Sequence, residues 1–79
     1  MNNLALILQI LDDSEGRKVN LRVIRSEFWL RAGKEISEGD AKAALKEAGR
    51  KGWVTQGENA FGDVTWTITA KGQEVALSE

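Results

Sequence analysis

The 79-residue sequence predicts a small α+β domain of three helices, a two-stranded hairpin and a short C-terminal helix. Apolar residues recur at helical spacing through the first 50 residues, and from Trp53 they alternate with polar residues at every second position. A threonine near the end, Thr69, is placed to open one more helix. The length allows one domain, over residues 1–79, around a single small core.

The first helix is expected over residues 4–12, with Asn3 as its N-cap. Its apolar residues cover an arc of about 200° at 100° per residue, and they are Leu4, Leu6, Ile7, Leu8, Ile10 and Leu11. A helix so apolar lies at the centre of a core or contributes to a subunit contact. For the second case, Leu6 and Ile10 are the candidate residues of a partner interface.

The next two helices are marked by capping residues. Asn20 opens a helix over 21–32, and Gly33 is placed to end it. Ser37 opens a third helix over 38–50, in a capping box that has Asp40 in place of Glu or Gln. The inner face of this third helix is made of small residues and one leucine: Ala41, Ala44, Leu45 and Ala48.

Two strands and a final helix are expected after Gly52. The strands cover 53–56 and 64–68, and the loop 57–63 joins them. Strict alternation in the second strand would place Val64, Trp66 and Ile68 on one face and Thr65 and Thr67 on the other. Thr69 would cap a helix over 70–77, with Val75 and Leu77 returning to the core.

Composition excludes several classes of function. The chain has no Cys and no His, which excludes zinc fingers, haem or iron–sulfur sites, disulfides and Ser-His-Asp triads. The glycine-spaced run 57–62 is followed by Asp63 and Val64, where a phosphate-binding loop needs Lys and Ser or Thr. We therefore expect a non-enzyme with no metal, cofactor or small-molecule substrate.

The apolar run 4–11 bears on membranes and location. It is far shorter than the about 20 residues that span a bilayer. No basic segment precedes it, and acidic residues follow it in place of a cleavage site. We expect a cytoplasmic protein with no membrane partner.

The net charge of −1 conceals an uneven distribution along the chain. Residues 1–16 sum to −3, residues 17–51 to +5 and residues 52–79 to −3. A basic middle between acidic ends predicts a polarised surface, provided that the fold keeps the segments apart. Solvated helix faces with no partner would give the same pattern.

The order of these elements resembles a winged helix-turn-helix domain over nearly the whole chain. The likeness is carried by the apolar run 4–11, the Ser37-capped helix, its exit 50–54, and the run 66–72, which is like the Leu-Thr-x-x-Gly ending of many winged-helix regulators. The chain also resembles small winged-helix proteins of Mu-like phages and prophages. That narrower likeness is carried by Asn20, Ser37, Gly52-Trp53-Val54-Thr55 and Thr69-Ala70-Lys71-Gly72.

The resemblance implies that the third helix enters the major groove of duplex DNA. At 100° per residue, Lys46, Arg50 and Ala43 point about 40°, 80° and 100° from Lys42, opposite the small inner residues. Lys and Arg neutralise phosphates and read guanine, and a small residue lets the helix approach the bases. The candidate DNA-binding residues are Lys42, Ala43, Lys46, Arg50, Lys51, Arg22 and Arg25, with Arg17 and Lys18 as further candidates for backbone contact. This interpretation predicts a phage or bacterial transcription regulator.

The hairpin favours a different interpretation. Residues 53–70 contain no base, whereas wings that touch DNA often carry Arg or Lys. The acidic residues Glu58 and Asp63 would be repelled by phosphates, so we expect the wing to be held away from DNA. Winged helices also serve as protein-interaction modules. In that alternative, Trp29 beside Arg22 and Arg25 would anchor a second copy or another protein partner, unless it merely covers the edge of a thin core.

Overall fold

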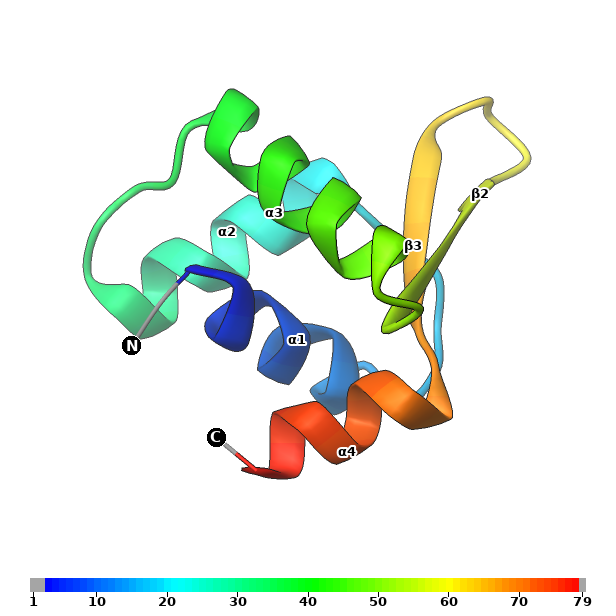
Figure 1. Cartoon of the computed structure of the whole chain (residues 1–79). Coiled ribbons are helices and arrows are strands. Elements are labelled where there is room, and N and C mark those ends of the chain that lie inside the picture. The colour runs from blue at the N-terminus through cyan, green and yellow to red at the C-terminus, as the bar shows by residue number, and fades with distance from the viewer. Residues whose placement is uncertain (1–2, 79) are drawn as a thin grey trace.

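The computed structural model describes residues 3–78, and the structural statements below concern these residues. Figure 1 shows α1 at the centre of the molecule, with α2 and α3 on one side, α4 on the other and a hairpin projecting beside α3. The elements in chain order are α1 (Asn3–Asp13), β1 (Val19–Asn20), α2 (Leu21–Ala32), α3 (Glu38–Arg50), β2 (Val54–Glu58), β3 (Val64–Ile68) and α4 (Ala70–Ser78). The predicted α+β winged-helix architecture is confirmed, with one strand more than expected.

The helix α1 is the central element of the core. Asn3 is itself part of this helix and is not the cap that we predicted. The helix contacts α2, α3, α4 and β3, so most of its circumference is covered. Leu6 and Ile10 are 7% and 1% exposed. The hypothesis that these two residues form a partner interface is corrected, because the domain itself buries the broad apolar arc.

The helices α2 and α3 begin and end as the capping residues predicted. Oδ1 of Asn20 accepts a hydrogen bond of 2.9 Å from the backbone N–H of Val23. Gly33 ends α2 with a φ of 74°, a left-handed conformation that glycine adopts without strain. Oγ of Ser37 accepts a hydrogen bond of 3.0 Å from the N–H of Asp40. These local signals fix the two helices of the helix-turn-helix.

The sheet has three antiparallel strands in the order β1-β3-β2, whereas the sequence predicted two. The additional strand, β1, has two residues, and Val19 and Asn20 pair with Trp66 and Thr65. Two residues are too few to show a period of two in the sequence. The strand joins the start of α2 directly to the wing, which makes β3 the central strand.

The predicted alternation in β3 is only partly correct. Trp66 and Ile68 are buried as expected, but Val64 is exposed and Thr65 is buried. Val64 pairs with Glu58 next to the turn of the hairpin. Thr65 lies between β1 and β2, opposite Asn20 and Gly57, so its side chain is enclosed by neighbours on both sides. Its Oγ1 has no hydrogen-bond partner among the described residues.

Replacing Thr65 with valine is expected to stabilise the protein by about 1 kcal/mol, because it removes a buried hydroxyl that makes no hydrogen bond and keeps the β-branched shape. Urea denaturation monitored by tryptophan fluorescence would measure the change in the free energy of unfolding. Thr55→Val, at an exposed position of β2, is the matched control and should change it little. A destabilised Thr65→Val variant would show that the hydroxyl is hydrogen-bonded in solution.

The helix α4 is fastened to the turn that follows α3. Oγ1 of Thr69 donates to the carbonyl groups of Gly52 and Trp53, at 2.7 and 3.0 Å, and accepts from the N–H of Gly72 at 3.0 Å. The predicted cap is thus confirmed. Leu77, however, is 80% exposed, and Ala76 is buried instead. Gly72 and Ala76, one helical turn apart, form the inner face of α4.

The three tryptophans differ in burial. Trp66 is buried, and Trp53 packs half-buried against the core. Trp29 is 54% exposed, so about half of its surface is open to solvent. None of the helices in the described part of the chain is long and apolar enough to cross a membrane.

Candidate nucleic-acid interface

The helix α3 packs through one side and leaves the opposite side open. Its inner side chains Ala41, Leu45 and Ala48 are buried against the core. Two of the three are alanines, so the helix axis can lie close to its neighbours. The opposite side faces solvent in Figure 1, between α2 and the hairpin.

The residues predicted for the outward face of α3 lie where the helical angles placed them. Lys42, Ala43, Lys46 and Arg50 are all exposed, and Lys51 directly follows the helix. Ala43 lies between Lys42 and Lys46 on this face. Because its side chain is small, a ligand can approach the helix backbone there. The structure therefore brings four of the predicted basic residues together along one helix.

Most of these basic residues are already paired with acids. Nζ of Lys42 lies 3.2 Å from Oε1 of Glu38, and Arg50 forms an ion pair with Glu47. Nζ of Lys51 lies 3.8 Å from the second oxygen of Glu47 and 5.0 Å from the centre of the Trp53 ring. Ion pairs with this exposure are worth about 0–1 kcal/mol, so phosphates can replace the carboxylates.

Lys46 differs from its neighbours on α3. It makes no ion pair or hydrogen bond within residues 3–78, although it lies in the middle of the outward face. A Lys side chain without an acidic partner gives up no ion pair when it binds a phosphate. Lys46 is therefore the first cation on this face to be tested.

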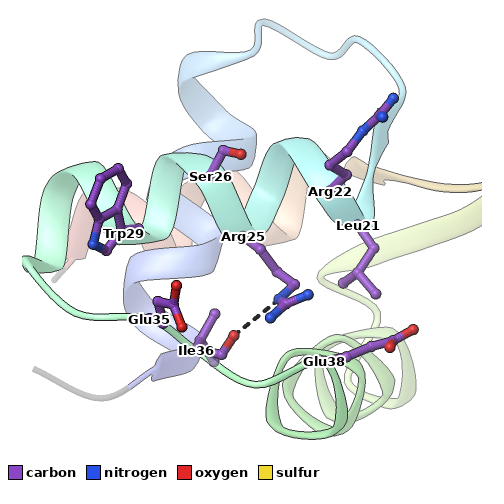
Figure 2. A pocket seen from close by; sticks show the side chains of 8 residues that line it. All are labelled: Leu21, Arg22, Arg25, Ser26, Trp29, Glu35, Ile36 and Glu38. Atoms are coloured by element: carbon purple, nitrogen blue, oxygen red, sulfur yellow. Dashed lines mark hydrogen bonds between the residues drawn. The ribbon is translucent and has the colours of Figure 1, made fainter.

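The two predicted arginines of α2 have different surroundings. Nε of Arg25 donates a hydrogen bond of 3.0 Å to the backbone carbonyl of Ile36, which ties α2 to the segment before α3 (Figure 2). Arg22 is exposed and points away from that segment (Figure 2). Arg25 thus positions the start of α3, whereas Arg22 is available to a ligand.

Two surface hollows show how the predicted residues group. The groove of Figure 2 lies between α2 and the segment leading into α3, and its lining includes Arg22, Arg25 and Trp29 with Glu35 and Glu38. It therefore carries balanced charge and one exposed aromatic ring. The second hollow joins α2, α3 and the wing, and is lined by Asn20, Leu21, Arg22, Lys42, Asp63, Val64 and Trp66. Arg22 and Lys42 thus lie around one hollow, with Asp63 of the wing beside them.

The tip of the wing is an ordered turn. Oδ1 of Asn59 accepts hydrogen bonds from the backbone N–H groups of Phe61, at 2.8 Å, and Asp63, at 3.1 Å. Gly62 has a φ of 82°, which the turn requires. Phe61 is 90% exposed at this tip. The sequence analysis predicted neither this hydrogen-bonded turn nor the exposed Phe61. The positions of Asn59 and Gly62 on either side of Phe61 are typical of such a turn and could have indicated it.

Two more of the predicted basic residues lie outside the helices. Arg17 and Lys18 are exposed in the segment before β1. The specific pairing of Glu47 with Arg50 and Lys51 was not predicted, although the spacings of three and four residues indicated it. In the described part of the chain, no group of three or more acidic residues is placed to hold a metal ion.

No protein-family model matches the sequence, and no curated protein matches it. Solved structures do. RosR of H. salinarum is 19% identical, with a TM-score of 0.83 over 99% of this chain and 69% of that protein. A second structure of RosR, the complex described as RosR-S1, is also 19% identical, with a TM-score of 0.85 over 99% of this chain and 67% of that one. F93 from STIV, described as a winged-helix DNA-binding protein, is 22% identical, with a TM-score of 0.80 over 96% of this chain and 80% of F93.

A third similar protein is a proposed transcriptional regulator from Thermoplasma acidophilum, at 19% identity and a TM-score of 0.72 over 94% of this chain and 73% of that one. At identities of 19–22% these likenesses establish the fold, which is a winged helix. The narrower resemblance to proteins of Mu-like phages finds no support in these comparisons.

Proposed function

We propose that this protein is a non-enzymatic transcription regulator that binds duplex DNA with the outward face of α3. The observation that carries the proposal is the position of Lys42, Ala43, Lys46 and Arg50, which are all exposed along the open side of the second helix of a helix-turn-helix. The description of F93 as a DNA-binding protein with the same fold supports it. A phage or bacterial origin is part of the proposal and rests on the sequence resemblance alone.

The cations of α3 supply both affinity and readout in this proposal. Each Lys or Arg that meets a phosphate releases counterions, which favours binding at low salt. An arginine at the end of the helix can donate two hydrogen bonds to guanine. Ala43 allows the helix to approach the base edges, and Arg22 next to Lys42 extends the basic surface onto α2.

The wing takes no part in phosphate contact in this proposal. Its exposed acids Glu58 and Asp63 would be repelled by the DNA backbone, and no base lies between Trp53 and Ala70. With few phosphates neutralised, a monomer is expected to bind weakly, and dimerisation would raise the affinity.

The proposal is tested by titrating fluorescent duplex DNA with the protein at 50 and 200 mM salt. Contact with about five phosphates gives a slope of log K against log salt of roughly −4 to −5, which weakens binding several-hundred-fold over this range. Lys46→Glu combined with Arg50→Glu should abolish binding at both salt concentrations, because the double variant would place two negative charges in the major groove of the DNA.

The matched control reverses charges away from the proposed interface. Lys71 is an exposed residue of α4, so Lys71→Glu changes the net charge in the same direction and should bind DNA within about threefold of the wild type. Absence of duplex binding at 50 mM salt, or equal binding by the double variant, would contradict the proposal.

A second candidate function is a protein-interaction module, which the exposure of Trp29 and Phe61 favours. Trp29 lies at the groove with Arg22 and Arg25, and tryptophan and arginine are the residues most frequent at binding hot spots. A protein captured from lysate that resists nuclease treatment and is lost in Trp29→Ala would support this function. Light scattering of the purified protein would show whether the partner is a second copy.

A further inference from the structure

The carboxylate of Glu47 lies between two cations of the proposed interface. It forms an ion pair with the guanidinium of Arg50, and its other oxygen lies 3.8 Å from Nζ of Lys51. The Glu47 side chain is partly exposed, and its ion pair with Arg50 is also a hydrogen bond, which Arg50 donates. One acid thus binds both basic residues at the end of α3.

This arrangement lowers the charge that the free protein presents. Lys42 is paired with Glu38, and Glu47 occupies Arg50 and Lys51. On α3, as far as the structure describes contacts, only Lys46 is left without an acid. Glu47 competes with phosphates for Arg50 and Lys51, which weakens non-specific binding.

The position of Glu47 also brings it close to DNA. At 100° per residue it lies about 60° from the outward direction of α3, on the side of Arg50. A helix that enters the major groove would carry this carboxylate toward the base edges. Phosphates repel it there, but the exocyclic amine N4 of cytosine can donate a hydrogen bond to it.

We infer that Glu47 is a specificity-determining residue of this interface: it restrains Arg50 and Lys51 in the free protein and makes tight binding depend on a duplex site that offers the carboxylate a donor, namely cytosine. The inference rests on the proposed function and deepens it. The penalty against other sequences arises because an unpaired carboxylate in the groove is repelled by the phosphates.

The experiment compares Glu47→Gln with the wild type, because glutamine keeps the size of the side chain and removes its charge. Binding of a random duplex should tighten about 5- to 20-fold, since two exposed ion pairs no longer compete with phosphates. The slope of log K against log salt should steepen by about one to two. Selection from a randomised duplex pool should enrich a cytosine at one position with the wild type and lose that preference with the variant.

Glu74→Gln is the control, since it makes the same charge change on α4. It should alter random-duplex affinity by less than about threefold and leave the selected sequence unchanged. Thermal melting of each variant checks the fold, and Glu47→Ala provides a second neutral variant. If Glu47 only stabilises the helix, Glu47→Gln will lower the melting temperature and leave affinity and selected sequence unchanged, which overturns the inference while the proposed function stands. If the wild type and both variants bind no duplex at 50 mM salt, the proposed function fails as well.

Discussion

Replacing Gly72 with alanine is expected to destabilise the protein by about 3 kcal/mol or more, which is a large part of the stability of a domain of this size. A Cβ at this position would lie 2.1 Å from the carbonyl oxygen of Trp53 and 2.8 Å from the side chain of Ile68. The first of these atoms belongs to the backbone and cannot rotate away. The helix α4 would have to move, and the hydrogen bonds between Thr69 and the turn at Gly52 would be lost.

Urea denaturation followed by tryptophan fluorescence would measure this loss. Gly39→Ala is the matched control, because the added Cβ would meet no other side chain or distant backbone within 4 Å and the backbone there is helical. That variant should be as stable as the wild type or slightly more so. If Gly72→Ala is as stable as the wild type, the close packing of α4 against the turn after α3 is contradicted.

Replacing Ile10 with alanine is expected to lower the free energy of unfolding by about 3 kcal/mol, because Ile10 is almost fully buried and its truncation leaves a cavity in the core. The same change would have little effect on stability if Ile10 lay in an exposed partner interface, as one interpretation of the sequence held. The measurement therefore separates a core role from an interface role for the apolar arc of α1.

Leu77→Ala serves as the control for this prediction. Leu77 is mostly exposed, so its truncation should change the free energy of unfolding by less than about 0.5 kcal/mol. A dimer that dissociates in Ile10→Ala while the unfolding free energy stays constant would contradict the burial of α1.

The elements that the sequence predicted best have strong local signals. The side chains of Asn20, Ser37 and Thr69 each accept a hydrogen bond from the backbone N–H three residues later. The capping geometry therefore depends on only four consecutive residues. The outward face of α3 was equally predictable, because helical periodicity alone separates Lys46 from the buried Leu45.

The features that escaped prediction depend on contacts between distant segments. The strand β1 exists only because Val19 meets Trp66 across the sheet, and two residues carry no periodic pattern. Leu77 was assigned to the core by its hydrophobicity, but the close approach of Gly72 to Trp53 sets the rotation of α4 and turns Ala76 inward. Thr65 is buried although polar, because it lies in the central strand.

The candidate site was predictable in its residues and less so in its charge. The sequence identified the basic residues of α3, yet the pairing of Arg50 with Glu47 and the tie from Arg25 to Ile36 depend on side-chain geometry. A count of charges along the chain therefore overstated the free positive charge on this surface.

The enclosure of α1 has a consequence for how the protein is made. The first helix of the chain packs against the last one, α4, as well as against α2, α3 and β3 (Figure 1). During synthesis α1 leaves the ribosome before α4, with which it makes extensive contact. Until α4 emerges, part of the apolar run 4–11 stays exposed to water, and exposed apolar surface on a partly synthesised chain favours aggregation.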